Sequence, residues 1–328
     1  MARAALAFLC IALLAWMTLA LAFFPVGTER LHPALAALVP IGAILALILL
    51  RPLWRVAAAI LVAFAVVLVA WLAVPPSNDR DWQPDLATLP FAEIDGDRIV
   101  VHNVRNADYR SETDFTVHLE DRDYDLSQLR SLDLFLIYWG SPRIAHTIMS
   151  WGFEGDRYLA ISIETRKEKG EDYSAVRGFF RNYELAYVVA DERDVVRLRT
   201  NYRGEDVYVY RIQGPQEVGQ QVLLAYLRAV NDLKERPQWY NALTQNCTTT
   251  IQHLTGPYQQ RSWWSWKLFL NGYLDELAYE IGAIDRSMPF PALKAASHIN
   301  ERARAADSDP RFSVRIREGV PGMSGGGA

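Results

Sequence analysis

The sequence predicts an α+β domain with an antiparallel sheet, preceded by three transmembrane helices. The first 75 residues of the 328-residue chain are almost entirely apolar, with a few charged residues between long hydrophobic runs. In the rest of the chain, stretches with the alternating pattern of β-strands come first, and stretches with the 3.6-residue period of helices follow. Such a mixture is typical of a sheet with helices packed on it, which defines the α+β class.

Three apolar runs are long enough to cross a bilayer. They are Ala4–Phe24, Pro33–Leu50 and Val56–Val74, and each approaches the roughly 20 residues that a membrane-spanning helix needs. We therefore assign residues 1–76 to a three-helix transmembrane anchor. The alternative for the first run is a cleaved signal peptide, but this run is long and leads directly into two further apolar segments.

The basic residues of the anchor predict its orientation. Arg3 precedes the first span, and Arg51 and Arg55 separate the second from the third, whereas the loop between the first two spans holds one acid and one base, Glu29 and Arg30. The positive-inside rule then places the N-terminus in the cytoplasm and everything after the third span outside. In a bacterium we expect a multi-pass protein of the inner (cytoplasmic) membrane with its soluble domain in the periplasm.

The exported part divides by composition. We expect a proline-bearing linker at residues 77–88, a folded domain at residues 89–317 and a disordered, glycine-rich tail at residues 318–328. The formal net charge is −4 and the pI is near 5.9, which does not suggest nucleic acid as a partner. Membrane lipids are the expected partners of the anchor.

Several stretches of the exported domain have the pattern of half-buried strands, because β-branched and aromatic residues alternate with polar ones or run together. These stretches are Arg98–Val104, Thr113–Glu120, Arg143–Phe153, Arg157–Thr165 and Val207–Ile212.

Two of these strands form an expected β-hairpin around the glycine-bearing turn Glu154–Asp156. A three-residue turn places Glu164 opposite His146, with Ser162 diagonal to it on the same face of the sheet. A two-residue turn would place Thr165 there instead.

Two later segments have helical periodicity. Gln216–Leu233 and Trp266–Ile281 each carry apolar residues on one stripe of a 3.6-residue repeat. Trp263, Trp264 and Trp266, beside the basic Lys267, suit a segment at a membrane interface, or they are core residues.

Cys247 is the single cysteine of the exported part, since Cys10 lies in the first apolar run. Asn246 is a suitable N-cap for a helix beginning at the cysteine, and a helix N-terminus favours the reactive thiolate. The free N–H groups of that first turn can also bind an oxyanion. The alternative is a buried, inert thiol.

His146 is the candidate base for this thiol, because it lies on an apolar strand about a hundred residues before Cys247. A satisfied buried histidine is the alternative. Glu164 is the candidate third group that orients the imidazole, with Ser162 beside it; Glu164 could otherwise be a solvated acid paired with Arg166.

Amide side chains near the cysteine are further candidates. Asn241, Gln245 and Asn246 could help to bind an oxyanion, or could cap or line a turn. No cluster of histidine, cysteine and carboxylate has zinc-like spacing, so we expect neither a metal nor another cofactor.

Taken together, several motifs resemble the Lnb-type periplasmic domain family. The similarity lies in Ala145–Thr147, Ser162–Gly170, Tyr183–Leu185, Arg197–Arg203 and Tyr240–Thr250, and it extends over roughly residues 115–254. The resemblance implies a papain-like domain of the NlpC superfamily in a permuted order, in which the histidine precedes the cysteine.

The resemblance also implies a cysteine acyltransferase, with Cys247 as the nucleophile that carries the acyl group as a thioester and His146 as the base. The characterised Lnb enzymes move an acyl chain from the glyceryl group of a bacterial lipoprotein onto the α-amino group of its N-terminal cysteine, so the resemblance implies a lipoprotein or an acyl-lipid as the substrate, although many members of the family have no known substrate. Two alternatives stay open: a cysteine amidase or peptidase of the cell wall, and a non-catalytic membrane scaffold.

Overall fold

The computed structural model describes residues 2–25, 31–241, 265–268 and 270–323. The chain forms two compact units. The first, called here the membrane unit, comprises Met1–Arg80, Glu171–Glu184 and Gln238–Leu243. The second, called the sheet unit, comprises Asp81–Gly170, Leu185–Pro237 and Thr244–Ala328.

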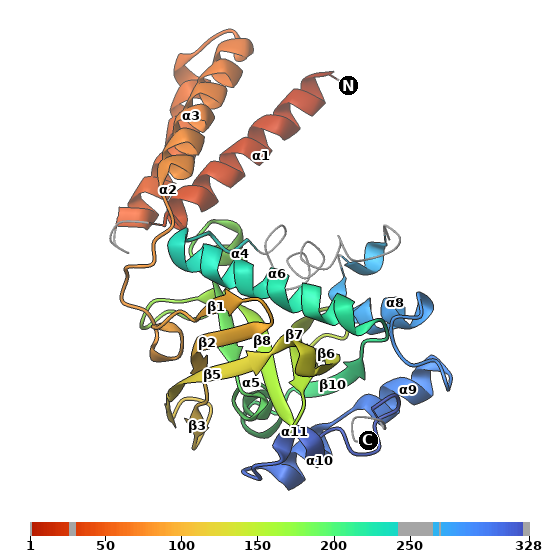
Figure 1. The fold of residues 1–328 in the computed structure, drawn as a ribbon. Helices are drawn as coiled ribbons and strands as arrows, with labels where there is room; N and C mark the ends of the chain where they lie inside the picture. Colours follow the sequence, from red (N-terminus) through yellow and green to blue (C-terminus); the bar gives the residue numbers. More distant parts are fainter. Residues whose placement is uncertain (1, 26–30, 242–264, 269, 324–328) are drawn as a thin grey trace. The chain divides into compact units, whose positions relative to one another are not determined.

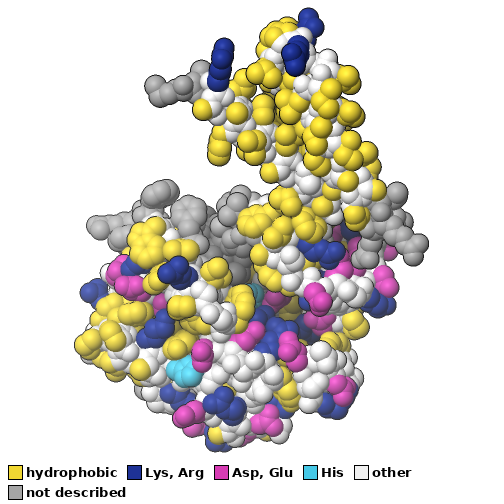
Figure 2. All heavy atoms as spheres, turned by 180° about the vertical axis from the view of Figure 1, so that it is seen from behind, with side chains coloured by type: hydrophobic (Ala, Val, Ile, Leu, Met, Phe, Trp, Pro, Cys, Tyr) yellow, Lys and Arg dark blue, Asp and Glu magenta, His cyan; other side chains and the backbone are white. Residues whose placement is uncertain are grey.

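The membrane unit contains the three expected apolar helices, α1 (Ala2–Ala22), α2 (Leu31–Leu49) and α3 (Leu53–Ala73). Each is long and apolar enough to cross a bilayer. Apolar side chains cover the outside of these helices, whereas charged side chains are interspersed over the sheet unit (Figure 2). A helix that is apolar all round is a buried or a membrane helix, so the chain is a membrane protein.

The sheet unit is built on an eight-stranded sheet (Figure 1). Its strands are β1 (Phe91–Asp95), β2 (Arg98–Arg105), β5 (Leu119–Asp125), β6 (Leu129–Tyr138), β7 (Ala145–Phe153), β8 (Arg157–Arg166), β9 (Glu184–Ala190) and β10 (Asp206–Arg211). The order across the sheet is β1-β2-β9-β8-β7-β6-β10, with β5 also paired to β2. The short strands β3 (Asp108–Tyr109) and β4 (Phe115–Thr116) form a separate ribbon.

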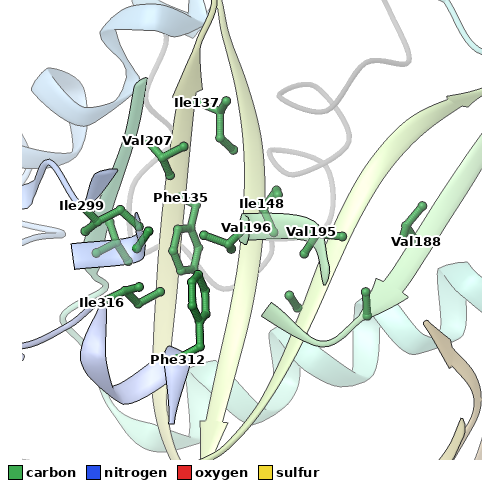
Figure 3. Packing of buried hydrophobic residues seen from close by; sticks show 14 of the residues in the cluster. Phe135, Ile137, Ile148, Val188, Val195, Val196, Val207, Ile299, Phe312 and Ile316 are labelled. Atoms are coloured by element: carbon green, nitrogen blue, oxygen red, sulfur yellow. The ribbon is translucent and has the colours of Figure 1, made fainter. Parts of the chain in front are cut away.

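Helices cover both faces of the sheet. On one face α6 (Gln216–Glu235) packs on Trp151, whose Nε1 donates to the Gly219 carbonyl at 3.0 Å. On the other face lie α5 (Glu192–Arg197), α10 (Asn300–Ala306) and α11 (Phe312–Arg315). A hydrophobic core fills this second interface, where Phe135 and Ile148 of the sheet lie in one buried cluster with Phe312 and Ile316 (Figure 3).

The fold class is α+β as expected, but the sheet is mixed rather than purely antiparallel, because β2 and β9 pair in parallel at Arg105 and Ala190. The expected strand Thr113–Glu120 is divided between β4 and β5. Strands β6 and β9 were not anticipated. Both are buried almost throughout, and a strand buried on both faces lacks the polar alternation that marks a half-buried strand.

The expected helix Trp266–Ile281 is not continuous. Short 3₁₀ turns occupy Trp266–Leu268 and Asn271–Tyr273, and only α8 (Leu274–Glu280) is α-helical. Gly272 packs closely on the connection between β6 and β7, residues 139–144. A Cβ added at Gly272 would lie 2.3 Å from the Pro142 carbonyl oxygen. This tertiary contact competes with the regular helical path.

The ordered part of the sheet unit is longer than the composition suggested. Trp82 and Leu86, placed in the linker by composition, are 5% and 7% exposed. Beyond the expected end at Arg317, Val320 is 1% exposed and belongs to the same buried cluster as Phe312 and Ile316. Apolar residues in a proline- or glycine-rich stretch still gain from burial when the core leaves room for them.

Candidate functional site

The β7–β8 hairpin has the register of a three-residue turn. Ile148 pairs with Ser162, and Phe153 pairs with Arg157 across Glu154–Asp156. Because side chains two residues apart on a strand share a face, His146, Ser162 and Glu164 all point to the side that carries Ile148. The structure thus brings together three of the residues selected from the sequence.

His146 is held by two polar neighbours on β8. Its Nε2 atom lies 2.7 Å from Ser162 Oγ and 3.1 Å from Glu164 Oε1. Ser162 is fully buried and His146 is 7% exposed, so these contacts form largely away from solvent. A buried histidine with two such neighbours has a defined ring orientation.

The hydrogen bonds also define the tautomer of His146. Ser162 Oγ donates its single proton to Glu164 Oε1 at 2.6 Å, so it can only accept from the imidazole. Nε2 is therefore the protonated nitrogen of the neutral ring. Nδ1 is then the nitrogen that can take a proton from a nucleophile, as a general base requires.

A fourth residue, Arg199, completes the network. Its Nη2 atom donates to Glu164 Oε1 at 2.9 Å, and its Nη1 atom donates to Glu205 Oε2 at 3.2 Å. Arg199 lies in a short π-helical turn, Leu198–Tyr202, directly after α5, and is 8% exposed. Turns of this kind recur at functional sites.

The sequence pattern assigned no role to Arg199. It stands within the motif Arg197–Arg203 that carries the family resemblance, but a short segment with several arginines does not indicate which one turns inward. Only the packing of the turn against β8 selects it.

The charges around Glu164 determine its protonation. Burial disfavours the carboxylate, but the electrostatic interactions with His146 and Arg199 and the hydrogen bonds of His146 and Ser162 outweigh burial, so the pKa of Glu164 lies well below its ordinary value. Glu164 is therefore an ionised carboxylate at neutral pH. The expected alternative, a pair with Arg166, does not form: Arg166 donates instead to the carbonyls of Leu86 and Ala87.

The start of β7 is clamped just before His146. The side chain of Asn271 accepts from the Ala145 N–H at 2.9 Å and donates to the Ala145 carbonyl at 2.6 Å. Gly272 N–H donates to the Arg143 carbonyl at 3.0 Å. This clamp fixes the backbone that carries the imidazole.

Apolar side chains are exposed around the same connection. Trp139 and Ile144 belong to the β6–β7 connection, and Trp266 and Leu270 belong to the segment whose Asn271 and Gly272 clamp it; these four are exposed large apolar residues. Lys267, expected to accompany an interfacial tryptophan, is instead buried and paired with Glu280 and Glu276. Exposed apolar patches of this kind mark interaction sites.

The remaining candidates lie elsewhere. Cys247, Gln245 and Asn246 fall outside the described residues, as do Trp263 and Trp264. Asn241 is half-buried and belongs to the membrane unit, whereas His146, Ser162 and Glu164 belong to the sheet unit. In the part of the chain that the structure describes, no group of three histidine, cysteine or carboxylate side chains could hold a metal ion.

These observations define the class of the protein: a membrane protein whose α+β domain holds a buried histidine in a carboxylate and arginine network. Residues 115–266 match the family model of the Lnb N-terminal periplasmic domain, so this part of the chain is similar to an Lnb-type periplasmic domain. The match is somewhat under half of the chain and includes every residue of the network. No curated protein and no solved structure matches the chain.

Proposed function

We propose that the protein is a membrane-anchored cysteine acyltransferase that acts on the acyl groups of lipids or lipoproteins. The observation that carries this proposal is the chain of contacts from Arg199 through Glu164 and Ser162 to His146. Such an arrangement is suited to a general base whose ring must be oriented and whose charged form must be stabilised. The family match, which also includes Cys247, supports a thiol as the group on which this base acts.

In the first half-reaction, His146 Nδ1 takes the thiol proton of Cys247, and the thiolate attacks the carbonyl carbon of a lipid ester. The C–S bond forms, and the tetrahedral oxyanion collapses with cleavage of the C–O bond. The leaving alkoxide takes the proton from the imidazolium of His146. An acyl thioester on Cys247 and a free hydroxyl on the lipid result.

In the second half-reaction, an amine attacks the thioester carbonyl, and His146 removes a proton from the attacking nitrogen. The C–N bond forms and the C–S bond breaks, which regenerates the Cys247 thiol when the imidazolium returns its proton. Water in place of the amine would give hydrolysis. Gln245 and Asn246 are the proposed sources of side-chain donors to the oxyanion, together with backbone N–H groups next to the cysteine.

Two features favour an acylated substrate over a cell-wall peptide. The three apolar helices anchor the domain to the bilayer, where acyl-lipids are concentrated. Trp139 and Ile144 are exposed on the connection that enters the His146 strand, and Trp266 and Leu270 are exposed on the segment that clamps it. Exposed apolar side chains suit an acyl chain better than a hydrophilic glycopeptide. A papain-like arrangement of the domain, implied by the resemblance, accords with cysteine chemistry.

We place the protein in the bacterial inner membrane as a multi-pass protein. Support comes from its basic residues: at the end of the helix bundle where α1 begins and α2 passes to α3, the charged side chains are those of Arg3, Arg51 and Arg55. A periplasmic reporter fused after Met323 should be active, and one inserted between Arg51 and Arg55 inactive; the reverse pattern would exclude this orientation.

The decisive experiment is mass spectrometry of lipoprotein N-termini from cells that express the wild-type protein or its Cys247→Ala variant. We expect an N-acylated lyso-form that depends on Cys247. Unchanged lipoproteins together with Cys247-dependent release of free fatty acid would indicate hydrolysis. Cys247-dependent cleavage of cell-wall peptides would establish the amidase or peptidase activity instead. Identical results for the wild-type and Cys247→Ala proteins would favour the non-catalytic membrane scaffold.

A further inference from the structure

A segment of the exported part packs on the ends of two membrane helices. The segment Glu171–Glu184 contains the short helix α4 (Ala175–Phe179) and belongs to the membrane unit. Phe180, directly after α4, is 6% exposed, and its ring centre lies 6.2 Å from that of Trp16 and 6.1 Å from that of Phe23. Phe180 therefore occupies a site formed by α1.

Further contacts fix this segment on α3 and on the end of α1. Trp71 Nε1 donates to the Phe180 carbonyl at 3.3 Å, and the Arg181 guanidinium lies 4.2 Å from the centre of the Trp71 ring. Asn182 Nδ2 donates to the Phe23 carbonyl at 2.5 Å. These polar contacts satisfy groups at helix ends that have no partner within their own helix.

The contacts also set the depth of the segment in the membrane. Trp16 lies six residues before the end of α1 at Ala22, which is roughly 9 Å along a helix. Trp71 lies within the last turn of α3. Phe180 contacts Trp16 through its ring and Trp71 through its backbone carbonyl, so it lies at the level of the last turns of the spans, where tryptophan side chains and the polar headgroups meet in a bilayer.

The helix α4, and Tyr173 two residues before it begins, leave apolar side chains uncovered. Val176 and Phe179 are 44% and 39% exposed, and Tyr173 is 50% exposed. Val176 and Phe179 are three residues apart, so they lie on one face of the helix. In water this exposed apolar face would be unfavourable, whereas contact with lipid would bury it.

We propose that Glu171–Glu184 is an interfacial element that inserts Val176 and Phe179 among the phospholipids of the leaflet in which α1 and α3 end. The occupant of this surface is lipid rather than a protein partner. Arg181, stacked on Trp71, lies at the depth of lipid phosphates, where a guanidinium is favourable. The segment follows the strand that carries Glu164 and precedes β9, so two core strands of the sheet unit are joined by a piece of chain embedded in the interface.

Depth-resolved fluorescence of the full-length protein tests this inference without any assay of activity. Single cysteines replace Val176, Phe179 or Tyr173 in a background with Cys10→Ala and Cys247→Ala, and each is labelled with the polarity-sensitive fluorophore NBD. These side chains are exposed, so their replacement leaves the packing of Phe180 intact. Val62→Cys, on the lipid-facing side of α3, and Glu301→Cys, exposed on α10, provide membrane and water controls.

The labelled proteins are reconstituted into vesicles of phosphatidylethanolamine and phosphatidylglycerol. We expect NBD at residues 176 and 179 to be quenched most strongly by lipids with a nitroxide at the headgroup and to be shielded several-fold from aqueous iodide relative to the label at residue 301. The label at residue 62 should respond to a nitroxide deep in the acyl chain. Iodide quenching at 176 and 179 equal to that at 301 would overturn the proposal.

Discussion

Arg199 Nη2 donates a 2.9 Å hydrogen bond to Glu164 Oε1, the same oxygen that accepts from Ser162 and lies 3.1 Å from His146 Nε2. One carboxylate oxygen thus connects a buried cation to the proposed base. Because Arg199 also pairs with Glu205, it serves two carboxylates at once. This arrangement makes the geometry of His146 dependent on a residue that cannot itself reach the imidazole.

The first prediction concerns the nucleophile and the base. Cys247→Ser and His146→Ala should each lower turnover by roughly 100-fold to 10,000-fold, the range that general acid–base catalysis supplies. The double variant should lose little more, because the two groups act as one unit. Single-turnover acyl transfer measures this, and the wild-type intermediate should be released by hydroxylamine. Independent, multiplicative losses would argue against a shared mechanism.

The second prediction concerns the charge of Glu164. Glu164→Gln keeps the size of the side chain but removes the negative charge beside His146, so kcat should fall by about 10-fold to 100-fold, less than loss of the base itself. Glu154→Gln, at the exposed turn of the same hairpin, is the matched control and should leave kcat unchanged. Equal activity of the Glu164→Gln and Glu154→Gln proteins would exclude an orienting role.

The third prediction is a pH dependence of stability. The pKa of Glu164 is lowered in the folded protein relative to its ordinary value of 4.5, so its ionised form stabilises the fold. This contribution should be complete above about pH 5 and should be lost as the pH falls through the ordinary value toward the lowered one. The difference in unfolding free energy between wild type and Glu164→Gln, followed by urea unfolding in detergent, should shrink only on that acidic side. A difference that disappears instead at alkaline pH would contradict this sign.

The fourth prediction concerns Arg199. Arg199→Gln leaves Glu164 and Glu205 without their shared cation and should cost roughly 3 to 5 kcal/mol of unfolding free energy, as removal of one partner from a buried ion pair does. Arg199→Lys keeps the charge and should cost less. Arg203→Gln breaks a more exposed pair with Glu112 and should cost under about 1 kcal/mol. If Arg199→Gln lowered the unfolding free energy no more than Arg203→Gln does, the Arg199 network would not contribute to the stability of the fold.

The fifth prediction concerns the clamp on β7. Gly272→Ala would place a methyl group 2.3 Å from the Pro142 oxygen and 2.5 Å from the Arg143 carbonyl carbon. The β6–β7 connection must then move, at a cost of roughly 1 to 3 kcal/mol, and kcat should fall because His146 moves with it. Gly42→Ala, where no atom beyond the adjacent residues and the backbone of the same helix lies within 4 Å of the added methyl, is the control for both measurements. Full activity of Gly272→Ala would show that His146 does not depend on the clamp.

Local pattern was sufficient for the membrane helices and for three of the four residues in the His146 network. The length and apolarity of three runs predict α1, α2 and α3, because a bilayer imposes both requirements on any single helix. The hairpin register follows from the period-two pattern and a three-residue turn, and this register alone assigns Glu164 and Ser162 to the face of His146. These are interactions between residues close in sequence.

Features that depend on contacts between distant residues were decided only by the tertiary structure. Arg199 reaches Glu164 because the turn after α5 packs on β8. The apolar period from Trp266 to Ile281 indicates one helix, but Gly272 and Asn271 engage the β6–β7 connection instead and interrupt it. The local sequence around Phe180 indicates only a loop residue, whereas in the structure its ring contacts Trp16 and its carbonyl accepts from Trp71. In each case the observed conformation is stabilised by contact with a residue that is distant in the sequence, and local sequence patterns carry no information about that residue.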